Sequence, residues 1–194
     1  PGYKPTTTLF PSWLKGTDGR FVDEYPPPDF EQGTRQVNAL MAQAQLELGE
    51  IPPLTILTVS SPTGAKVAEY FQGMLKQSLG IEALVDQQSF KQYLNKSRQG
   101  DFDLGLSSWY PDFDDLVTYA DLLGSYNANN RGRFVNREYD EWLEVLQRSV
   151  DPKERFGAAA EMQRIIVEQV PVLPTAETGS AYLVHPKLKG MIRR

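Results

Sequence analysis

The chain has 194 residues, which is enough for one sizeable hydrophobic core or for one domain with an arm. Hydrophobic residues make up 40% of it and charged residues 23%, the ordinary composition of a globular protein. The formal net charge of -5 argues against a nucleic acid as partner, and the absence of cysteine excludes disulfides, thiolate metal sites and cysteine nucleophiles.

The first 28 residues are rich in proline, glycine and threonine and lack a helical period. We expect residues 1–28 to form an extended arm packed on the domain that follows. The expected docking points of the arm are apolar: Leu9, Phe10, Trp13 and Leu14. The sequence has no signal peptide and no run long enough for a transmembrane helix. It begins with Pro1-Gly2 and not with an initiator methionine, so we expect a piece excised from a longer protein.

Helix and strand signals alternate along the next part of the chain. Apolar runs predict strands over residues 54–59, 81–85 and 102–106. Capping residues predict the helices: Asp29 with Gln32, Ser61 with Pro62, and Ser89 with Gln92 at the starts, and Gly49, Gly80 and Gly100 at the ends. The apolar stripe of the second helix is Val67, Tyr70, Phe71, Met74 and Leu75. This alternation favours parallel strands joined by right-handed crossovers.

In the last third of the chain, most sequence signals are those of helices. Asn136 and the pair Asp151-Pro152 are predicted helix starts. Val172-Leu173 lies between two prolines, so we expect an edge segment there at most. Residues 181–184 are the expected last strand.

The most informative stretch follows the predicted strand at 102–106. Pro111 removes a backbone donor and restricts the residue before it, so Trp109 to Asp115 must form a loop. This loop carries three aromatic residues and three carboxylates. In open α/β sheets, ligands bind in the crevice beyond the carboxyl ends of the strands. The loop is therefore a candidate ligand wall.

Three interpretations of the carboxylates in this loop are open. Asp114 or Asp115 could cap a helix that follows, with Trp109 in the core, because aspartate is a preferred N-cap residue. The carboxylates could instead hold a hard cation, although the loop pattern of calcium sites is absent. In the third interpretation, one carboxylate anchors a cationic group of a ligand beside an aromatic platform.

Residues suited to catalysis are scarce. His185 is the only histidine, and no serine or carboxylate neighbour marks it as a general base. None of the common nucleophile, phosphate-binding, dinucleotide-binding or zinc motifs occurs. Asp112 with Asp114 or Asp115 is the one local carboxylate pair of the kind that a glycosidase needs. We therefore do not expect an enzyme.

The order of these segments resembles the solute-binding proteins of oligopeptide and dipeptide ABC transporters, the family 5 extracellular solute-binding proteins. The most specific part is Phe102-Asp103-Leu104 followed by Ser108-Trp109-Tyr110-Pro111-Asp112-Phe113-Asp114-Asp115, which is similar to a motif of that family. Supporting matches lie further on: Tyr139-Asp140, the helix of Arg155 and Glu161, Pro171-Val172-Leu173-Pro174, and Tyr182-Leu183-Val184 before Leu188-Lys189-Gly190. The matching part of the family is its carboxy-terminal lobe.

The resemblance implies an α/β fold: a lobe like those of the type II periplasmic binding proteins, with a mixed, mostly parallel sheet flanked by helices. Residues 29–194 would form a single ligand-binding lobe, a fragment of a larger two-lobe protein. Asp112 aligns with the acid that pairs with the α-ammonium group of a peptide, and Trp109 lines the same pocket. The other expected ligand-binding residues belong to the same loop: Ser108, Tyr110 and Phe113.

The resemblance also implies a role in transport. The expected task is to capture oligopeptides outside the cytoplasm, in the periplasm or as a cell-surface lipoprotein, and to deliver them to ABC permease subunits. It implies a monomer with no cofactor, no metal and no chemical step. Leu116 stands where the family usually has proline, which leaves open a sugar or a metal chelate as ligand of the same fold. A carboxylate-dependent hydrolase is the alternative from another class.

Overall fold

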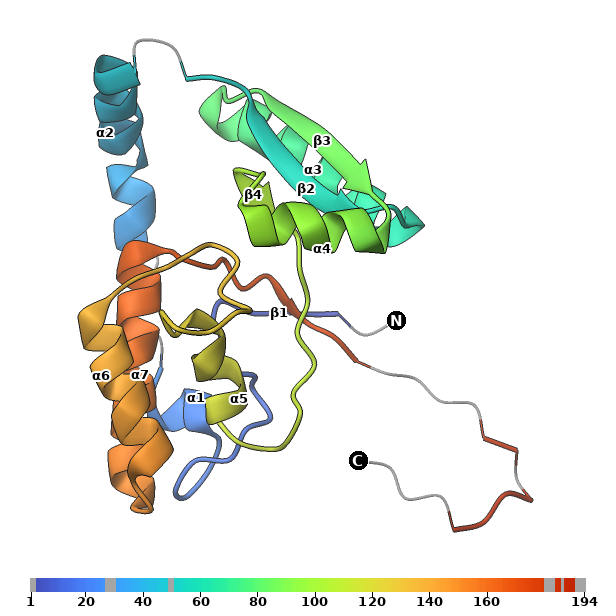
Figure 1. Ribbon diagram of the computed structural model, residues 1–194. Helices are drawn as coiled ribbons and strands as arrows, with labels where there is room; N and C mark the ends of the chain where they lie inside the picture. Colours follow the sequence, from blue (N-terminus) through green and yellow to red (C-terminus); the bar gives the residue numbers. More distant parts are fainter. Residues whose placement is uncertain (1–2, 27–30, 49–50, 180–183, 186, 191–194) are drawn as a thin grey trace.

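The computed structural model describes residues 3–26, 31–48, 51–179, 184–185 and 187–190. Figure 1 shows two parts: a small parallel sheet with its helices, and a helical part that contains the arm and the carboxy-terminal helices. No helix within the described ranges is long and apolar enough to cross a bilayer.

The sheet part alternates strands and helices, as expected. Its elements are β2 (Leu54–Val59), α3 (Pro62–Leu79), β3 (Ala83–Gln88), α4 (Phe90–Gln99) and β4 (Leu104–Gly105). The strand order is β3-β2-β4, and both pairs are parallel. In Figure 1, α4 lies in front of this sheet and α3 behind it. The predicted α/β architecture, a mostly parallel sheet flanked by helices, is confirmed.

The helical part contains segments from the first and from the last part of the chain. Its elements are β1 (Lys4–Pro5), α1 (Phe21–Glu24), α2 (Glu31–Leu48), α5 (Val117–Ala120), the 3-10 helix η1 (Asp121–Leu123), α6 (Arg137–Arg148), α7 (Pro152–Gln169) and β5 (Ala176–Glu177). Its core combines side chains of the arm with those of α5, α6 and α7; the largest include Phe10, Phe21, Tyr139, Leu146, Met162 and Ile165.

The capping residues of the sequence do set the helix ends. Their side chains accept hydrogen bonds from N–H groups of the first turn: Ser61 from Gly64 (3.0 Å), Ser89 from Gln92 (3.4 Å), Asn136 from Tyr139 (2.9 Å) and Asp151 from Lys153 (3.0 Å). Gly80 and Gly100 end α3 and α4 with φ of 68° and 75°, a conformation that glycine adopts without strain. Asp29 and Gly49 lie outside the described residues.

Two of the predicted strands have different boundaries. β3 is shifted beyond the expected range 81–85 to end at Gln88, because every residue of β2 pairs with one of β3. β4 has only two residues in place of the expected 102–106. The N–H groups of Asp103 and Leu106 nevertheless donate to carbonyls of β2, at 3.1 and 2.9 Å. The chain is thus held beside β2 up to the start of the loop.

A second sheet was not predicted. β1 pairs with β5 in antiparallel fashion, with Lys4 opposite Glu177. The edge segment expected at Val172-Leu173 forms no strand, because the flanking prolines remove donors and the strand starts only after them. Of the expected strand 181–184, residues 181–183 lie outside the described residues, and Val184 belongs to no strand.

Three of the four predicted docking residues hold the arm on the core. Phe10 and Leu14 are buried as expected, and Leu9 packs against the same core. Trp13 is 47% exposed, so it lies at the surface. The arm is also not extended throughout: Phe21 is buried at the start of α1, and burial of its ring fixes one helical turn there.

The predicted stripe of α3 is buried only in part. Ala68, Phe71 and Leu75 form the face that packs against the sheet. The other members of the stripe are exposed: Val67, Tyr70 and Met74. A sheet of three strands covers only a narrow strip of a helix, so the wider stripe stays in solvent.

Candidate functional site

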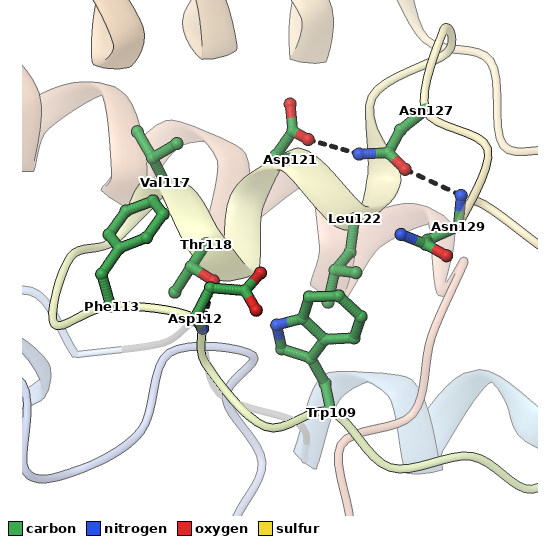
Figure 2. Close-up of a pocket in the computed structure, with 9 residues that line it drawn as sticks. All are labelled: Trp109, Asp112, Phe113, Val117, Thr118, Asp121, Leu122, Asn127 and Asn129. Carbon is green, nitrogen blue, oxygen red and sulfur yellow. Dashed lines mark hydrogen bonds between the residues drawn. The ribbon is translucent and has the colours of Figure 1, made fainter. Parts of the chain in front are cut away.

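The loop after β4 forms one wall of a hollow, shown in Figure 2. The backbone N–H of Asp112 donates to the hydroxyl of Thr118 at 3.3 Å, and Thr118 is itself buried in α5. This bond fixes the loop on the helix. Figure 2 shows the carboxylate of Asp112 beside the indole of Trp109, with Phe113 next to Val117. Two predicted site residues therefore lie together on the same wall.

The hollow has a volume of about 140 Å³. Its lining comes from the loop, from α5 and η1, and from the turn that follows η1: Trp109, Asp112, Phe113, Val117, Thr118, Asp121, Leu122, Asn127 and Asn129. Pockets that enclose a drug-sized ligand measure roughly 300–1,000 Å³. This hollow can therefore hold only one part of such a ligand.

The carboxylate of Asp112 is exposed, and within the described part of the chain it enters no ion pair or hydrogen bond. Its negative charge is thus available to a ligand. Trp109 is 38% exposed, so its ring is accessible beside that charge. A carboxylate next to an aromatic face suits a cationic group, which gains a charge-assisted hydrogen bond and a cation–π contact together.

A second carboxylate of the hollow, Asp121, is already engaged. It accepts hydrogen bonds from the hydroxyl of Tyr126, from the amide of Asn127 and, at 3.1 Å, from Nε2 of Gln147. Burial raises the pKa of Tyr126, and the hydrogen bond to Asp121 raises it further. Asp121 therefore holds the turn after η1 in place and offers little to a ligand.

The opposite wall is a turn rich in asparagine. Oδ1 of Asn127 accepts from the N–H of Asn129 at 2.7 Å, and the buried Asn130 donates to the carbonyls of Gly124 (3.2 Å) and Phe134 (2.7 Å). The sequence-based prediction did not include this wall. The signal was the run of asparagines itself, because asparagine side chains commonly bond the backbone of their own turn.

Asp115 has a structural part in the same loop. Its Oδ1 accepts from the N–H of Val117 at 2.9 Å, and both carboxylate oxygens accept from Nη2 of Arg155 at 2.6 Å. Asp115 therefore supports the entry to α5, as the helix-entry interpretation expected, but the N-cap position itself is Leu116. Trp109 is 38% exposed and not part of the core, so that half of the interpretation is wrong. Across the described residues, no group of histidine, aspartate and glutamate is placed to hold a metal ion.

The two remaining predicted residues lie outside the hollow. Ser108 and Tyr110 are exposed, Tyr110 by 68%, and neither lines it. Their contact with a ligand stays a prediction. His185 is exposed as well, and its Nδ1 accepts from the N–H of Lys187 at 3.3 Å.

Tyr119 is a buried residue of α5 that does not line the hollow. Burial raises the pKa of its phenol to about 12, and the charges of Asp114 and Glu177 add to the shift. The phenol thus stays neutral, and its ring meets the edge of Trp13 at a centroid distance of 6.4 Å. An exposed aromatic of the arm therefore adjoins the helix of the hollow.

Comparison with known proteins identifies the family. Residues 1–131 match the sequence profile of the bacterial extracellular solute-binding proteins, family 5 Middle. The chain belongs to this family. The matched range includes the loop, α5 and the asparagine-rich turn up to Arg131, so every residue that lines the hollow falls within it.

Curated relatives match about three quarters of the chain or more. The periplasmic murein peptide-binding protein MppA of Escherichia coli (strain K12) is 29% identical over 97% of this chain and 35% of its own length. The dipeptide-binding protein DppE of Bacillus subtilis (strain 168) is 25% identical over 74% of this chain and 26% of its own length. The chain thus spans about a third of the length of such relatives or less.

Solved structures of the family have the same fold. The substrate-binding domain of an oligopeptide ABC transporter from Bacillus anthracis matches with a TM-score of 0.79 at 26% identity, over 91% of this chain and 35% of that one. The murein tripeptide-binding protein MppA of Escherichia coli matches with a TM-score of 0.74 at 27% identity, over 91% and 34%. The predicted lobe of a type II periplasmic binding protein is confirmed. The two curated relatives are named as peptide-binding proteins, and the Bacillus anthracis structure is named as the substrate-binding domain of an oligopeptide ABC transporter.

Proposed function

We propose that this chain belongs to the ligand-binding lobe of a two-lobe solute-binding protein that captures oligopeptides outside the cytoplasm. Residues 1–28 act as the arm and residues 29–194 as the lobe of one unit. The protein delivers its peptide to ABC permease subunits as a monomer without a cofactor. It does so in the periplasm or as a lipoprotein of the cell surface.

The observation that carries this proposal is the carboxylate of Asp112 beside Trp109, which has no partner among the residues that the structure describes. A peptide presents an α-ammonium group at its amino terminus, which matches this charge and the aromatic face. When a second lobe closes over the hollow, the ammonium loses its water, and a buried charge without a partner is very costly. Asp112 supplies that partner.

The size of the hollow supports recognition of a terminus. A volume of about 140 Å³ accommodates the amino-terminal end of a peptide and leaves the rest outside. Such a site reads the ammonium group and not a particular side chain. We infer that it accepts peptides of varied sequence.

The same geometry supports binding without a chemical step. Hydrolysis of a glycoside needs two carboxyl groups at a set separation, one acting as an acid and the other as a base or nucleophile. In the hollow, Asp121 already accepts from three donors, and outside it Asp115 is held by Arg155. Asp112 therefore lacks a second free carboxylate among the residues that line the hollow.

The test uses the full-length parent protein and two forms of one peptide. Asp112→Asn should weaken the peptide with a free amino terminus far more than its N-acetylated counterpart. Removal of one partner from a buried charge pair costs roughly 3–5 kcal/mol, and the acetylated peptide has no ammonium to leave unpaired.

Calorimetry measures both affinities. Asp114→Asn is the matched control, because Asp114 is exposed two residues away and does not line the hollow. Equal losses for the free and the acetylated peptide in Asp112→Asn would rule out the assignment.

A further inference from the structure

All nine residues that line the hollow lie in the chain between Gln99 and Arg133. Gln99 is the last residue of α4, and Arg133 follows the asparagine-rich turn. The two ends of this segment are in contact: Nη2 of Arg133 donates to the carbonyl of Gln99 at 2.5 Å and to that of Arg98 at 3.4 Å. A single side chain thus closes the part of the chain that carries the site.

We propose that Arg133 is a positioning residue for the ligand hollow, a clasp that holds its two walls at a fixed separation. The identity of the ligand rests on the proposed function, whereas the clasp itself rests on the geometry alone. Arg133 does not line the hollow, so its effect on a ligand is indirect.

The backbone has a left-handed conformation at both residues of this contact, Arg133 and Gly100. Arg133 has φ of 54°, which is uncommon for a residue other than glycine, and Gly100 has φ of 75°. A Cβ on Gly100 would come within 3.1 Å of the guanidinium carbon of Arg133, so the arginine fills the space that the glycine leaves. The last carbonyls of α4 lack helical partners and carry its negative dipole end, which favours a cation there.

Each wall is connected by hydrogen bonds to one end of this segment, the first through Leu106, whose carbonyl accepts from the hydroxyl of Tyr93 in α4 at 3.0 Å. The wall of Trp109 and Asp112 follows α4 through β4, which is hydrogen-bonded to β2. The opposite wall is tied to Arg133 through Asn130, whose carbonyl accepts from the N–H of Arg133 at 3.1 Å and whose Oδ1 accepts from Phe134 at 3.0 Å. Closing the segment removes conformational freedom from it, so less remains to be ordered when a ligand binds.

The first measurement is hydrogen exchange of the full-length parent without ligand. In Arg133→Asn the guanidinium is lost, but asparagine tolerates the left-handed conformation. The hydrogen-bonded amides of Asp112, Asn127 and Asn130, in the segments 106–116 and 124–131, should exchange about tenfold faster than in the wild type, which corresponds to ~1.4 kcal/mol. Amides of α7 should keep their wild-type rates. Arg133→Gly also suits this φ and gives the same test if Arg133→Asn does not fold.

The matched control is Arg137→Ala. Arg137 lies four residues further on, and its side chain is 93% exposed in an ion pair with Glu141. Its removal should leave exchange in both segments unchanged. Unchanged exchange in Arg133→Asn would overturn the proposal, and so would equal acceleration in α7, because that reports a general loss of stability.

The second measurement is peptide affinity. Arg133→Asn should bind a peptide with a free amino terminus about tenfold more weakly, and Arg133→Lys, which keeps a charged donor, should recover part of the loss. Wild-type affinity in Arg133→Asn would overturn the proposal. A wild-type parent that binds no peptide would contradict the proposed function, and hydrogen exchange alone would then decide on the clasp.

Discussion

Both carboxylate oxygens of Asp115 accept hydrogen bonds from Nη2 of Arg155, at 2.6 Å each. Asp112, three residues earlier, has no such partner within the described residues and lines the hollow. The ion pair fastens the start of α5 to α7, so it supports the helix on which the hollow rests. The two carboxylates of one loop thus differ: Asp115 is engaged in the fold, and Asp112 is left for the ligand contact that we propose.

The first prediction concerns stability. Asp115→Ala should lower the free energy of unfolding by about 1–2 kcal/mol, the lower part of the range for charged hydrogen bonds, because the side chain of Asp115 is 37% exposed. Asp112→Ala, which removes no contact of its side chain, should stay within ~0.5 kcal/mol of the wild type. Urea unfolding of the chain measures both. Equal losses in the two variants would contradict the division of tasks.

The second prediction concerns Trp109 as a reporter. In a full-length variant with Trp13→Phe and Trp142→Phe, Trp109 is the one tryptophan left in this part of the protein. Its indole lies beside the carboxylate of Asp112, so a bound ammonium group should change its fluorescence. A titration with peptide measures the change. No change at saturating peptide would show that Trp109 is not a wall of the ligand site.

Local signals predicted most of the fold. The starts of α3, α4, α6 and α7 depend on one side chain and the next turn of backbone, so the sequence reveals them directly. The pairing of β1 with β5 joins Lys4 to Glu177, and nothing in either short segment indicates a partner so distant. The exposure of Tyr70 likewise depends on how many strands the sheet has, which α3 itself does not encode.

Only one of the two walls of the hollow was predicted from the sequence. A strand end, a proline and a cluster of aromatic and acidic residues marked the loop as a candidate ligand wall. The resemblance to the family then assigned Asp112 and Trp109 to the pocket. Asn127 and Asn129 reach the hollow because Asp121 and Asn130 hold their turn in place. Those contacts form only once α5 and η1 are in position, so no local pattern reveals the second wall.

The third prediction concerns acid stability. Asp86 accepts hydrogen bonds from Lys96, at 2.5 Å, and from Gln88. Both bonds hold the pKa of Asp86 below its ordinary value of 3.8, and the bond from Lys96 has the larger effect. The pKa of Lys96 is raised, mainly by Asp86 and then by Asp101. A carboxyl group whose pKa is lower in the folded state stabilises the fold at pH values above its pKa in the unfolded state. This stabilisation is lost as the pH falls through the pKa of the folded state. Lys96→Met should therefore cost stability at neutral pH and progressively less below pH 3.8.

A pH series of unfolding free energies measures this difference. Lys76→Met is the control, since Lys76 forms an exposed ion pair with Glu82 at 2.8 Å. Exposed pairs contribute little, so the control should follow the wild type at every pH. A difference between Lys96→Met and the wild type that stays constant down to pH 3 would show that Asp86 does not carry the effect.

The last prediction is that the 194-residue chain folds alone but does not bind peptide with micromolar affinity. Four capped helices, a parallel sheet and a core of large buried side chains agree with one another, which favours independent folding. Binding is different, because the carboxylate of Asp112 is exposed and an exposed ion pair contributes only about 0–1 kcal/mol. Micromolar affinity requires about 8.2 kcal/mol, which one open wall does not supply. Calorimetry should show a cooperative melting transition that does not move when peptide is added, and micromolar binding to the isolated chain would show that its site is complete without a second lobe.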